Sequence, residues 1–126
     1  MDQNITTAYL GLFEALKTLL FSEDFQKRHR QQPKNFTRQR CLPFFIVVLF
    51  LLNLVKRALQ DELDEFFKLL AGADIAIRRV TKSAFIQARK KLKYEAFVEL
   101  NQTQVRYFYG HFETATWHGL RLVAID

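Results

Sequence analysis

The chain has 126 residues, of which 49% are hydrophobic; this suits one domain, with room for the beginning of a second, and excludes an intrinsically disordered chain. Phe occurs 13 times against 4 Gly and 2 Pro, which favours packed helices over turn-rich β structure. The single cysteine excludes an intrachain disulfide and a cysteine-type zinc site, and the N-terminus lacks the layout of a secretory signal.

The formal net charge is +6, and the positive charges are segregated along the chain. The first basic window, residues 25–60, contains no Asp or Glu but holds Lys27, Arg28, Arg30, Lys34, Arg38, Arg40, Lys56 and Arg57. The second basic window, residues 75–94, again has no acid but holds Arg78, Arg79, Lys82, Arg89, Lys90, Lys91 and Lys93. Such segregation favours a polyanionic partner, and a solvated basic surface without a partner is the alternative.

The first part of the chain predicts helices separated by a connector. Residues 5–21 carry apolar side chains at helical spacing, namely Leu10, Phe13, Leu16 and Leu20. Ser22 and Asp24 are candidate caps of a short turn or helix that runs through the basic residues 27–30. Residues 31–41 contain Pro33 and Asn35 and are interpreted as a connector.

Residues 42–55, which read LPFFIVVLFLLNLV, are apolar on every side. Pro43 suits the first turn of a helix, where its missing N–H costs no hydrogen bond. The run contains Asn53 and is shorter than the about 20 residues that a membrane-spanning helix needs. We interpret it as a buried central helix surrounded by the other helices, with a membrane segment as the alternative.

Residues 59–71 predict the next helix, with its inward and outward sides assigned from the periodicity. Leu63, Phe66, Phe67 and Leu70 are predicted to face inward, whereas Asp61, Glu62, Asp64 and Glu65 are predicted to face water. Gly72 predicts the end of this helix. After an irregular link over 73–80, Thr81 or Ser83 is expected to cap a helix that reads SAFIQARKKL, and residues 94–112 predict a further helix. Residues 120–125 predict the beginning of a strand, which Asp126 follows.

The helix over residues 83–92 carries the best candidate DNA-binding surface. Phe85, Ala88 and Leu92 share one side, and the opposite side pairs a Gln with two Lys. Gln side chains pair with adenine and Lys or Arg with guanine in the major groove, while neighbouring cations hold phosphates. We therefore predict DNA contacts from Arg78, Arg79, Lys82, Ser83, Gln87, Arg89, Lys90, Lys91 and Lys93. An amphipathic helix with a solvated basic face is the alternative.

With the helix over 59–71 before it, this helix forms a pair that is only helix-turn-helix-like, because the link is longer than the usual three or four residues. No enzyme site follows from spacing, since His29, His111 and His118 have no partners at metal-ligand spacing. Asp126, placed directly after an apolar strand, stands where many α/β folds and ribonuclease-H-like folds carry a metal ligand.

Three segments together resemble the transposases of the insertion-sequence-four family. They are FTRQRCLPFFIVVLFLLNLVKRALQDELDEFFKLL (residues 36–70), TKSAFIQARKKLKYEAFVELN (residues 81–101) and WHGLRLVAID (residues 117–126). The resemblance implies a DDE transposase with a ribonuclease-H-like catalytic core, in which two Asp and one Glu bind divalent metal ions, usually Mg²⁺. Asp126 matches the first Asp of that set, so the resemblance implies that it is a catalytic residue and a metal ligand of the full-length enzyme.

We therefore expect a mainly α fold, with a helical DNA-binding bundle over residues 1–115 and the first strand of a truncated ribonuclease-H-like domain over 116–126. The expected partner is double-stranded DNA at terminal inverted repeats, and no contact with a membrane is expected. A homodimer in the transposition complex is one alternative for the oligomeric state. The expected location is the cytoplasm, in association with the nucleoid. We expect the fragment to be inactive alone and to hold no cofactor, Mg²⁺ belonging to the full-length enzyme. The alternative is a non-enzymatic helical module that binds nucleic acid or represses transposition as a competitor.

Overall fold

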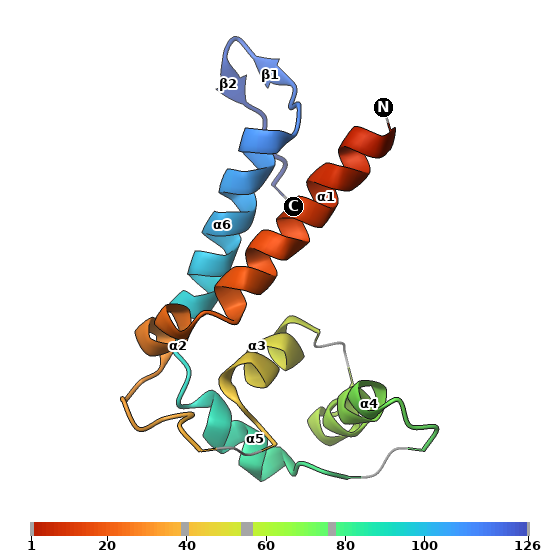
Figure 1. Ribbon diagram of the computed structural model, residues 1–126, viewed down its shortest axis with the longest axis vertical. Coiled ribbons are helices and arrows are strands. Elements are labelled where there is room, and N and C mark those ends of the chain that lie inside the picture. The colour runs from red at the N-terminus through yellow and green to blue at the C-terminus, as the bar shows by residue number, and fades with distance from the viewer. Residues whose placement is uncertain (1, 39–40, 54–56, 76–77, 126) are drawn as a thin grey trace. The chain divides into compact units, whose positions relative to one another are not determined.

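A computed structural model of the chain describes residues 2–38, 41–53, 57–75 and 78–125. The elements in chain order are the helices α1 (Asp2–Leu20), α2 (Glu23–His29), α3 (Phe44–Leu52), α4 (Leu59–Ala71), α5 (Lys82–Arg89) and α6 (Glu95–His111), and then the strands β1 (Thr116–Trp117) and β2 (Leu120–Arg121) (Figure 1). The fold is mainly helical, which confirms the fold class predicted from composition.

The chain divides into two compact units, unit 1 with residues 1–19 and 97–126 and unit 2 with residues 20–96. The boundary that we predicted between residues 115 and 116 stays a prediction. Residue 116 does begin β1, but the hairpin belongs to the same unit as the greater part of α6.

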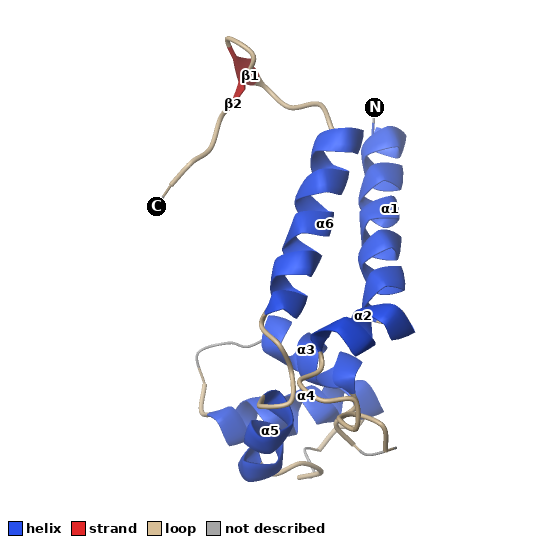
Figure 2. Cartoon of the chain, turned by 90° about the vertical axis from the view of Figure 1, so that its left-hand side faces the viewer, coloured by secondary structure: helices blue, strands red, loops and turns tan. Residues whose placement is uncertain are grey.

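In unit 1, α1 and α6 run antiparallel and lie side by side (Figure 2). The ring of Tyr9 on α1 lies 5.0 Å, centroid to centroid, from the ring of Phe112, which directly follows α6. Gly11 allows a close approach, because a Cβ atom at this position would overlap the hydroxyl group of Tyr107 on α6. The two helices therefore meet at the ring contact of Tyr9 with Phe112 and at the contact of Tyr107 with Gly11.

A short hairpin follows α6 in unit 1. Thr116 pairs with Arg121 and Trp117 with Leu120 in antiparallel register. The turn residues His118 and Gly119 have φ angles of 48° and 77°, and positive φ at both positions is what a two-residue type I′ turn requires.

Our prediction of a strand over residues 120–125 is correct only for its first two residues. Residues 122–125 are exposed and have no regular structure. A strand needs neighbouring strands to bond its backbone groups, and the hairpin supplies them only as far as Arg121.

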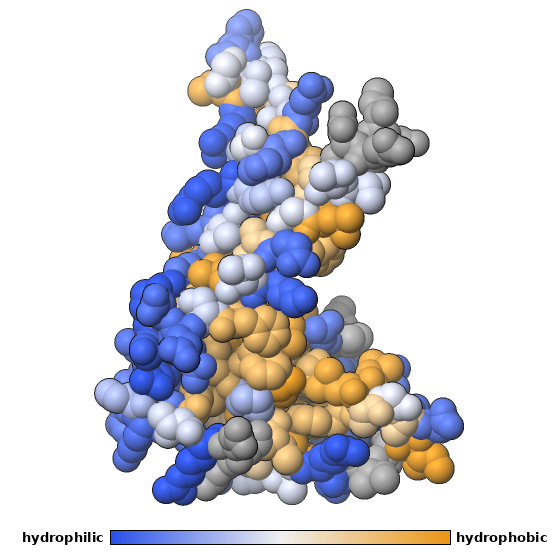
Figure 3. Space-filling view, viewed as in Figure 1, coloured by the Kyte–Doolittle hydropathy of each residue, from blue (hydrophilic) through white to orange (hydrophobic). Residues whose placement is uncertain are grey.

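Unit 2 has a core of phenylalanines contributed by several helices. Phe25, Phe44, Phe50 and Phe85 are each at most 2% exposed. The ring of Phe50 on α3 meets the ring of Phe85 on α5 edge-on, with centroids 4.7 Å apart, and α4 also contacts α5. In Figure 3 the hydrophobic surface of this unit gathers over α3 and α4.

The apolar run that begins at residue 42 forms α3, whose buried residues are Phe44, Ile46, Val47, Val48 and Phe50. This confirms the prediction of a buried helix, although Leu52 at the end of α3 is 58% exposed. Residues 54 and 55, the last of the predicted run, lie outside the described residues. In the part of the chain that the structure describes, no helix has both the length and the apolarity that crossing a membrane requires.

Local capping interactions set several helix ends. The Ser22 side chain accepts a hydrogen bond from the Phe25 N–H at the start of α2, and Thr81 accepts one from the Ala84 N–H at the start of α5, both 3.2 Å long. Gly72 ends α4 in the left-handed conformation, with φ of 62°. These findings confirm the caps predicted at Ser22 and Gly72 and select Thr81 over Ser83.

Two predictions about the faces of α4 are wrong. Glu62, predicted to face water, is only 8% exposed, and Leu70, predicted to face inward, is 53% exposed. Leu70 shares the apolar stripe of Leu63 and Phe67 but lies in the last turn, where no described neighbour covers it. Glu62 lies in the first turn at the edge of that stripe, and neighbouring elements cover it. The burial of a side chain on α4 therefore depends on the helical period and also on whether a neighbouring element covers that turn.

Candidate nucleic-acid interface

α5 presents its polar side to solvent, as predicted. Phe85, Ala88 and Leu92 are 0%, 8% and 8% exposed, so they attach the helix to the core of unit 2. The opposite side is exposed and carries Ser83 and Gln87. The predicted helix over 83–92 is too long at its end, because α5 ends at Arg89, and the exposed Lys90 and Lys91 directly follow it. An α-helix with its side chains is about 10–12 Å across, which fits the about 12 Å width of the major groove of DNA.

An open groove of about 770 Å³ runs along one flank of α5 in unit 2. From α5 and the residues around it, the groove is lined by Arg79, Val80, Thr81, Ala84, Gln87, Ala88 and Lys91. The other lining residues come from the connector between α2 and α3 and are Lys34, Asn35, Phe36, Thr37, Arg38, Cys41 and Leu42. The groove thus joins two segments that are far apart in the sequence.

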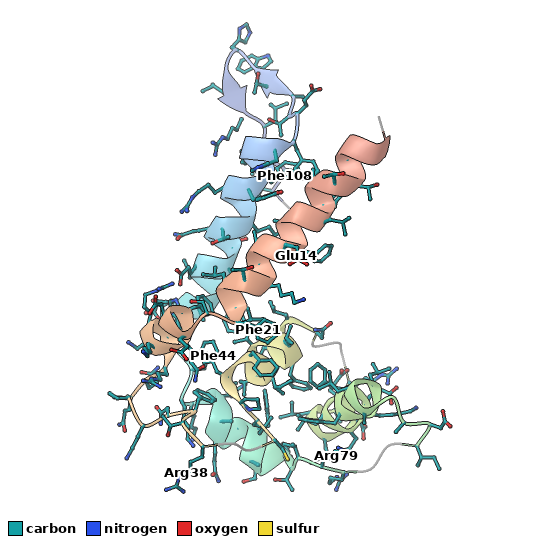
Figure 4. The ribbon with its side chains drawn as sticks, in the orientation of Figure 1. Glu14, Phe21, Arg38, Phe44, Arg79 and Phe108 are labelled. Carbon is teal, nitrogen blue, oxygen red and sulfur yellow. The ribbon has the colours of Figure 1, made fainter. Side chains whose placement is uncertain are left out.

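The two basic windows meet in this groove. Lys34 and Arg38 come from the first window, and Arg79 and Lys91 come from the second. Figure 4 shows Arg38 and Arg79 along the same lower edge of unit 2. Among the described residues, no acid lines the groove and none of these four cations forms an ion pair. Because like charges gathered in a concave surface focus the local potential, the groove has a positive local field.

The N-terminal end of α5 is held by a side chain of α4. The Gln60 amide donates from Nε2 to the Val80 carbonyl at 2.9 Å, and its Oε1 accepts from the Lys82 N–H at 2.8 Å. The same Nε2 also donates to Asp64 Oδ1 at 2.9 Å. These bonds fix the backbone on both sides of Thr81. They thereby also position the neighbouring cations Arg79 and Lys82 on unit 2.

The C-terminal end of α5 is held by backbone pairing with the end of α2. The Lys93 N–H donates to the His29 carbonyl at 2.7 Å, and the Gln31 N–H donates to the Lys91 carbonyl at 2.8 Å. Between them, Arg30 and Leu92 form an isolated antiparallel bridge. The pairing places the connector that follows α2 next to α5 and so determines the composition of the groove.

The residues predicted to contact DNA divide first into a groove side and an outward side of α5. Arg79, Gln87 and Lys91 line the groove. Ser83 and Lys90 are exposed and share the outward side of the helix with Gln87, given the helical spacing of 3 or 4 residues. These five positions can therefore face one ligand together.

The remaining predicted residues lie elsewhere around α5. Lys82 and Arg89 are exposed and lie seven residues, or about two helical turns, apart, and the helical period places them on the flank away from the groove. Arg78 forms an ion pair with Asp64, with 3.3 Å between Nη2 and Oδ2, so its charge is already partly balanced. Lys93 is half-buried, and its backbone N–H is used in the pairing with α2.

Lys34, Thr37 and Arg38 were not among the predicted DNA contacts, although all three line the groove. Their signal was the lack of acids in the first basic window. The lack of acids identifies a positively charged segment, but it does not predict which element this segment packs against. The structure adds these residues because it shows which segment lies beside α5.

Comparisons with known proteins do not assign a function to this surface. No protein-family model, curated protein or solved structure matches the chain.

The metal site implied by the family resemblance is not formed by the described residues. Asp126, the acid assigned to it, lies outside the residues that the structure describes. Within residues 2–38, 41–53, 57–75 and 78–125, no three His, Cys, Asp or Glu side chains gather in a way that would hold a metal ion. The residues that the structure describes therefore form no Mg²⁺ site by themselves.

Proposed function

We propose that this chain binds double-stranded DNA, with α5 lying in the major groove. The observation that carries the proposal is the groove of unit 2, to which the two basic windows contribute Lys34, Arg38, Arg79 and Lys91 without an acid among the described lining residues. Duplex DNA combines a dense row of negative phosphates with a groove that admits one α-helix. It therefore complements both the charge and the shape of this surface.

In this proposal the outward side of α5 contacts base edges, and its two flanks contact phosphates. Gln87 lies between Ser83 and Lys90 on the outward side, and the Gln amide can pair with adenine. A helix in the major groove has a sugar–phosphate backbone on each side, so it needs cations on both flanks. The groove side and the side of Lys82 and Arg89 supply them. With α4 packed against it, α5 acts as the second helix of a helix-turn-helix-like pair.

We further propose that the bound DNA is the terminal inverted repeat of a transposable element. This rests on the resemblance of residues 36–70, 81–101 and 117–126 to the insertion-sequence-four transposases. Several groove residues fall in these segments, including Arg38, Gln87 and Lys91. In this proposal the chain is the DNA-binding part of a DDE transposase of the nucleoid, and Asp126 is its first catalytic acid and Mg²⁺ ligand.

The proposal is tested by selection and binding measurements on the full chain. A randomised duplex library enriched on the protein supplies the preferred sequence, and fluorescence anisotropy gives its Kd. We expect the Lys90→Glu/Lys91→Glu variant to lose specific binding, because both residues are exposed directly after the last residue of α5. The matched control is Lys17→Glu/Arg106→Glu, which changes the net charge equally at exposed positions of unit 1.

A Lys90→Glu/Lys91→Glu variant that binds as tightly as the parent would overturn the proposal. Equal weakening of this variant and its control would show that net charge alone drives binding. Enrichment without any sequence preference would favour the non-specific nucleic-acid-binding module over recognition of element ends.

A further inference from the structure

The connector beside α5 has a defined conformation around Asn35. The Asn35 side chain is only 8% exposed, and its Oδ1 accepts a hydrogen bond from the Gln32 N–H at 2.9 Å. The Asn35 N–H in turn donates to the Gln32 carbonyl at 3.0 Å. One step further, the Thr37 hydroxyl donates to the Lys34 carbonyl at 2.7 Å. These bonds close residues 32–37 into consecutive turns, so the segment is organised before any ligand binds.

Phe36 anchors this loop to the core of unit 2. Its ring meets the buried ring of Phe44 edge-on at 5.5 Å, and its carbonyl accepts a hydrogen bond from Gln26 Nε2 at 3.3 Å. Phe36 also has a φ angle of 60°, which is uncommon for a residue with a side chain. Such a conformation persists only where the surroundings enforce it, and here α2 and α3 do so together.

The anchored residues hold two cations at the rim of the groove. Lys34 and Arg38 stand on either side of the segment 35–37, both are exposed, and both line the groove with Arg79 and Lys91. Neither forms an ion pair with a described residue, whereas Arg78, which does not line the groove, is paired with Asp64. The positive charges of the loop are therefore available to an anion that occupies the groove.

We infer that the loop Lys34–Arg38 is a preformed clamp for the sugar–phosphate backbone of the DNA strand that passes along the groove side of α5. The inference rests on the proposed function and adds to it a second DNA-contacting element outside α5 and its flanks. Lys34 and Arg38 hold phosphates from one side of the groove, and Arg79 and Lys91 hold the same strand from the side of α5. Because the loop is already ordered, binding loses little conformational entropy there.

The test measures the Kd of the full chain for a mixed-sequence duplex at several salt concentrations. Each neutralised phosphate contributes about 0.9 to the log–log slope, so Lys34→Ala/Arg38→Ala is expected to bind several-fold more weakly with a slope shallower by roughly 1.8. Lys17→Ala/Arg106→Ala, with the same charge change in unit 1, is the control that should keep the parental slope. Thr37→Val removes one bond of the loop without changing charge, and it is expected to weaken binding while the slope stays nearly parental.

The outcomes separate this inference from the proposed function. An unchanged slope in Lys34→Ala/Arg38→Ala, with parental duplex binding intact, would overturn the clamp and leave the role of α5 standing. Parental affinity in Thr37→Val would overturn the preformed character of the loop. Equal affinity for the single strand, with a slope near 0.7 per phosphate, would replace the duplex as the ligand. Failure of the parent chain to bind any duplex would overturn the proposed function and the clamp together.

Discussion

The backbone N–H of Lys82 donates a 2.8 Å hydrogen bond to the side-chain Oε1 of Gln60. The N–H groups in the first turn of a helix have no partner within the helix, so this bond satisfies one of the groups that α5 leaves open. The Nε2 of the same amide donates to the Val80 carbonyl, on the other side of the N-cap residue Thr81. A single side chain of α4 thereby determines where the candidate DNA-binding helix begins.

We predict that Gln60→Ala destabilises unit 2 and weakens DNA binding at the same time. Loss of hydrogen bonds to two backbone groups should lower the free energy of unfolding by about 1–2 kcal/mol, measured by thermal or urea denaturation. Gln104→Ala, which removes an exposed Gln from α6, is the control and should change the free energy of unfolding very little. Parental stability and parental Kd in Gln60→Ala would show that this amide does not position α5.

The central place of α3 predicts a sharp contrast between two positions of the same helix. Phe50 is 2% exposed and contacts the rings of Phe66 and Phe85, whereas Leu52 is 58% exposed. Phe50→Asp should unfold unit 2 or make the chain insoluble, because it removes a ring from the core and buries a charge in its place. Removal of a core Phe ring by substitution with Ala alone lowers the free energy of unfolding by about 3–5 kcal/mol. Leu52→Asp should remain folded. A soluble Phe50→Asp variant with unchanged circular dichroism and melting temperature would contradict this placement of α3.

The exposed Gln87 predicts a change in sequence preference rather than in overall affinity. Base-edge contacts carry discrimination of about 1–3 kcal/mol each, whereas phosphate contacts supply most of the affinity. Gln87→Ala should therefore broaden the sequences that the chain enriches from a random duplex library while its Kd for mixed DNA changes little. Gln104→Ala again serves as the control. If Gln87→Ala enriches the same sequences as the parent, Gln87 does not contact a base edge.

The close contact between the helices of unit 1 predicts a mutation that a second mutation rescues. A Cβ at Gly11 would overlap the Tyr107 hydroxyl, and the Tyr107 ring is stacked on His111 with centroids 3.9 Å apart, which restricts its movement. The overlap in Gly11→Ala should cost about 1–3 kcal/mol of stability, of which the better helix propensity of Ala offsets up to about 1 kcal/mol. Tyr107→Phe should restore part of the loss by removing the oxygen.

Gly110→Ala is the control for that experiment. Its new methyl group meets no atom within 4 Å, and the position lies in α6, so the substitution should raise stability by about 0.5–1 kcal/mol. Melting temperatures of the single and double variants decide the matter. If Tyr107→Phe fails to improve the Gly11→Ala variant, α1 and α6 do not pack through this contact.

The sequence by itself determined the elements whose causes are local. Ser22, Thr81 and Gly72 were readable as caps, because a cap acts on backbone groups only a few residues away. The same holds for the buried side of α5, where Phe85 and Ala88 follow the helical period. The segregation of positive charge into two acid-free windows is likewise a property of the chain before it folds.

Only the tertiary structure decided which turns are covered and which segments meet. Glu62 is buried and Leu70 is exposed, because coverage by neighbouring elements differs between the first and last turns of α4. The two basic windows share a groove because the end of α2 pairs with the residues after α5, through the bond from the Lys93 N–H to the His29 carbonyl. No local period encodes that pairing, since it joins residues far apart in the chain whose meeting depends on how the whole core of unit 2 packs.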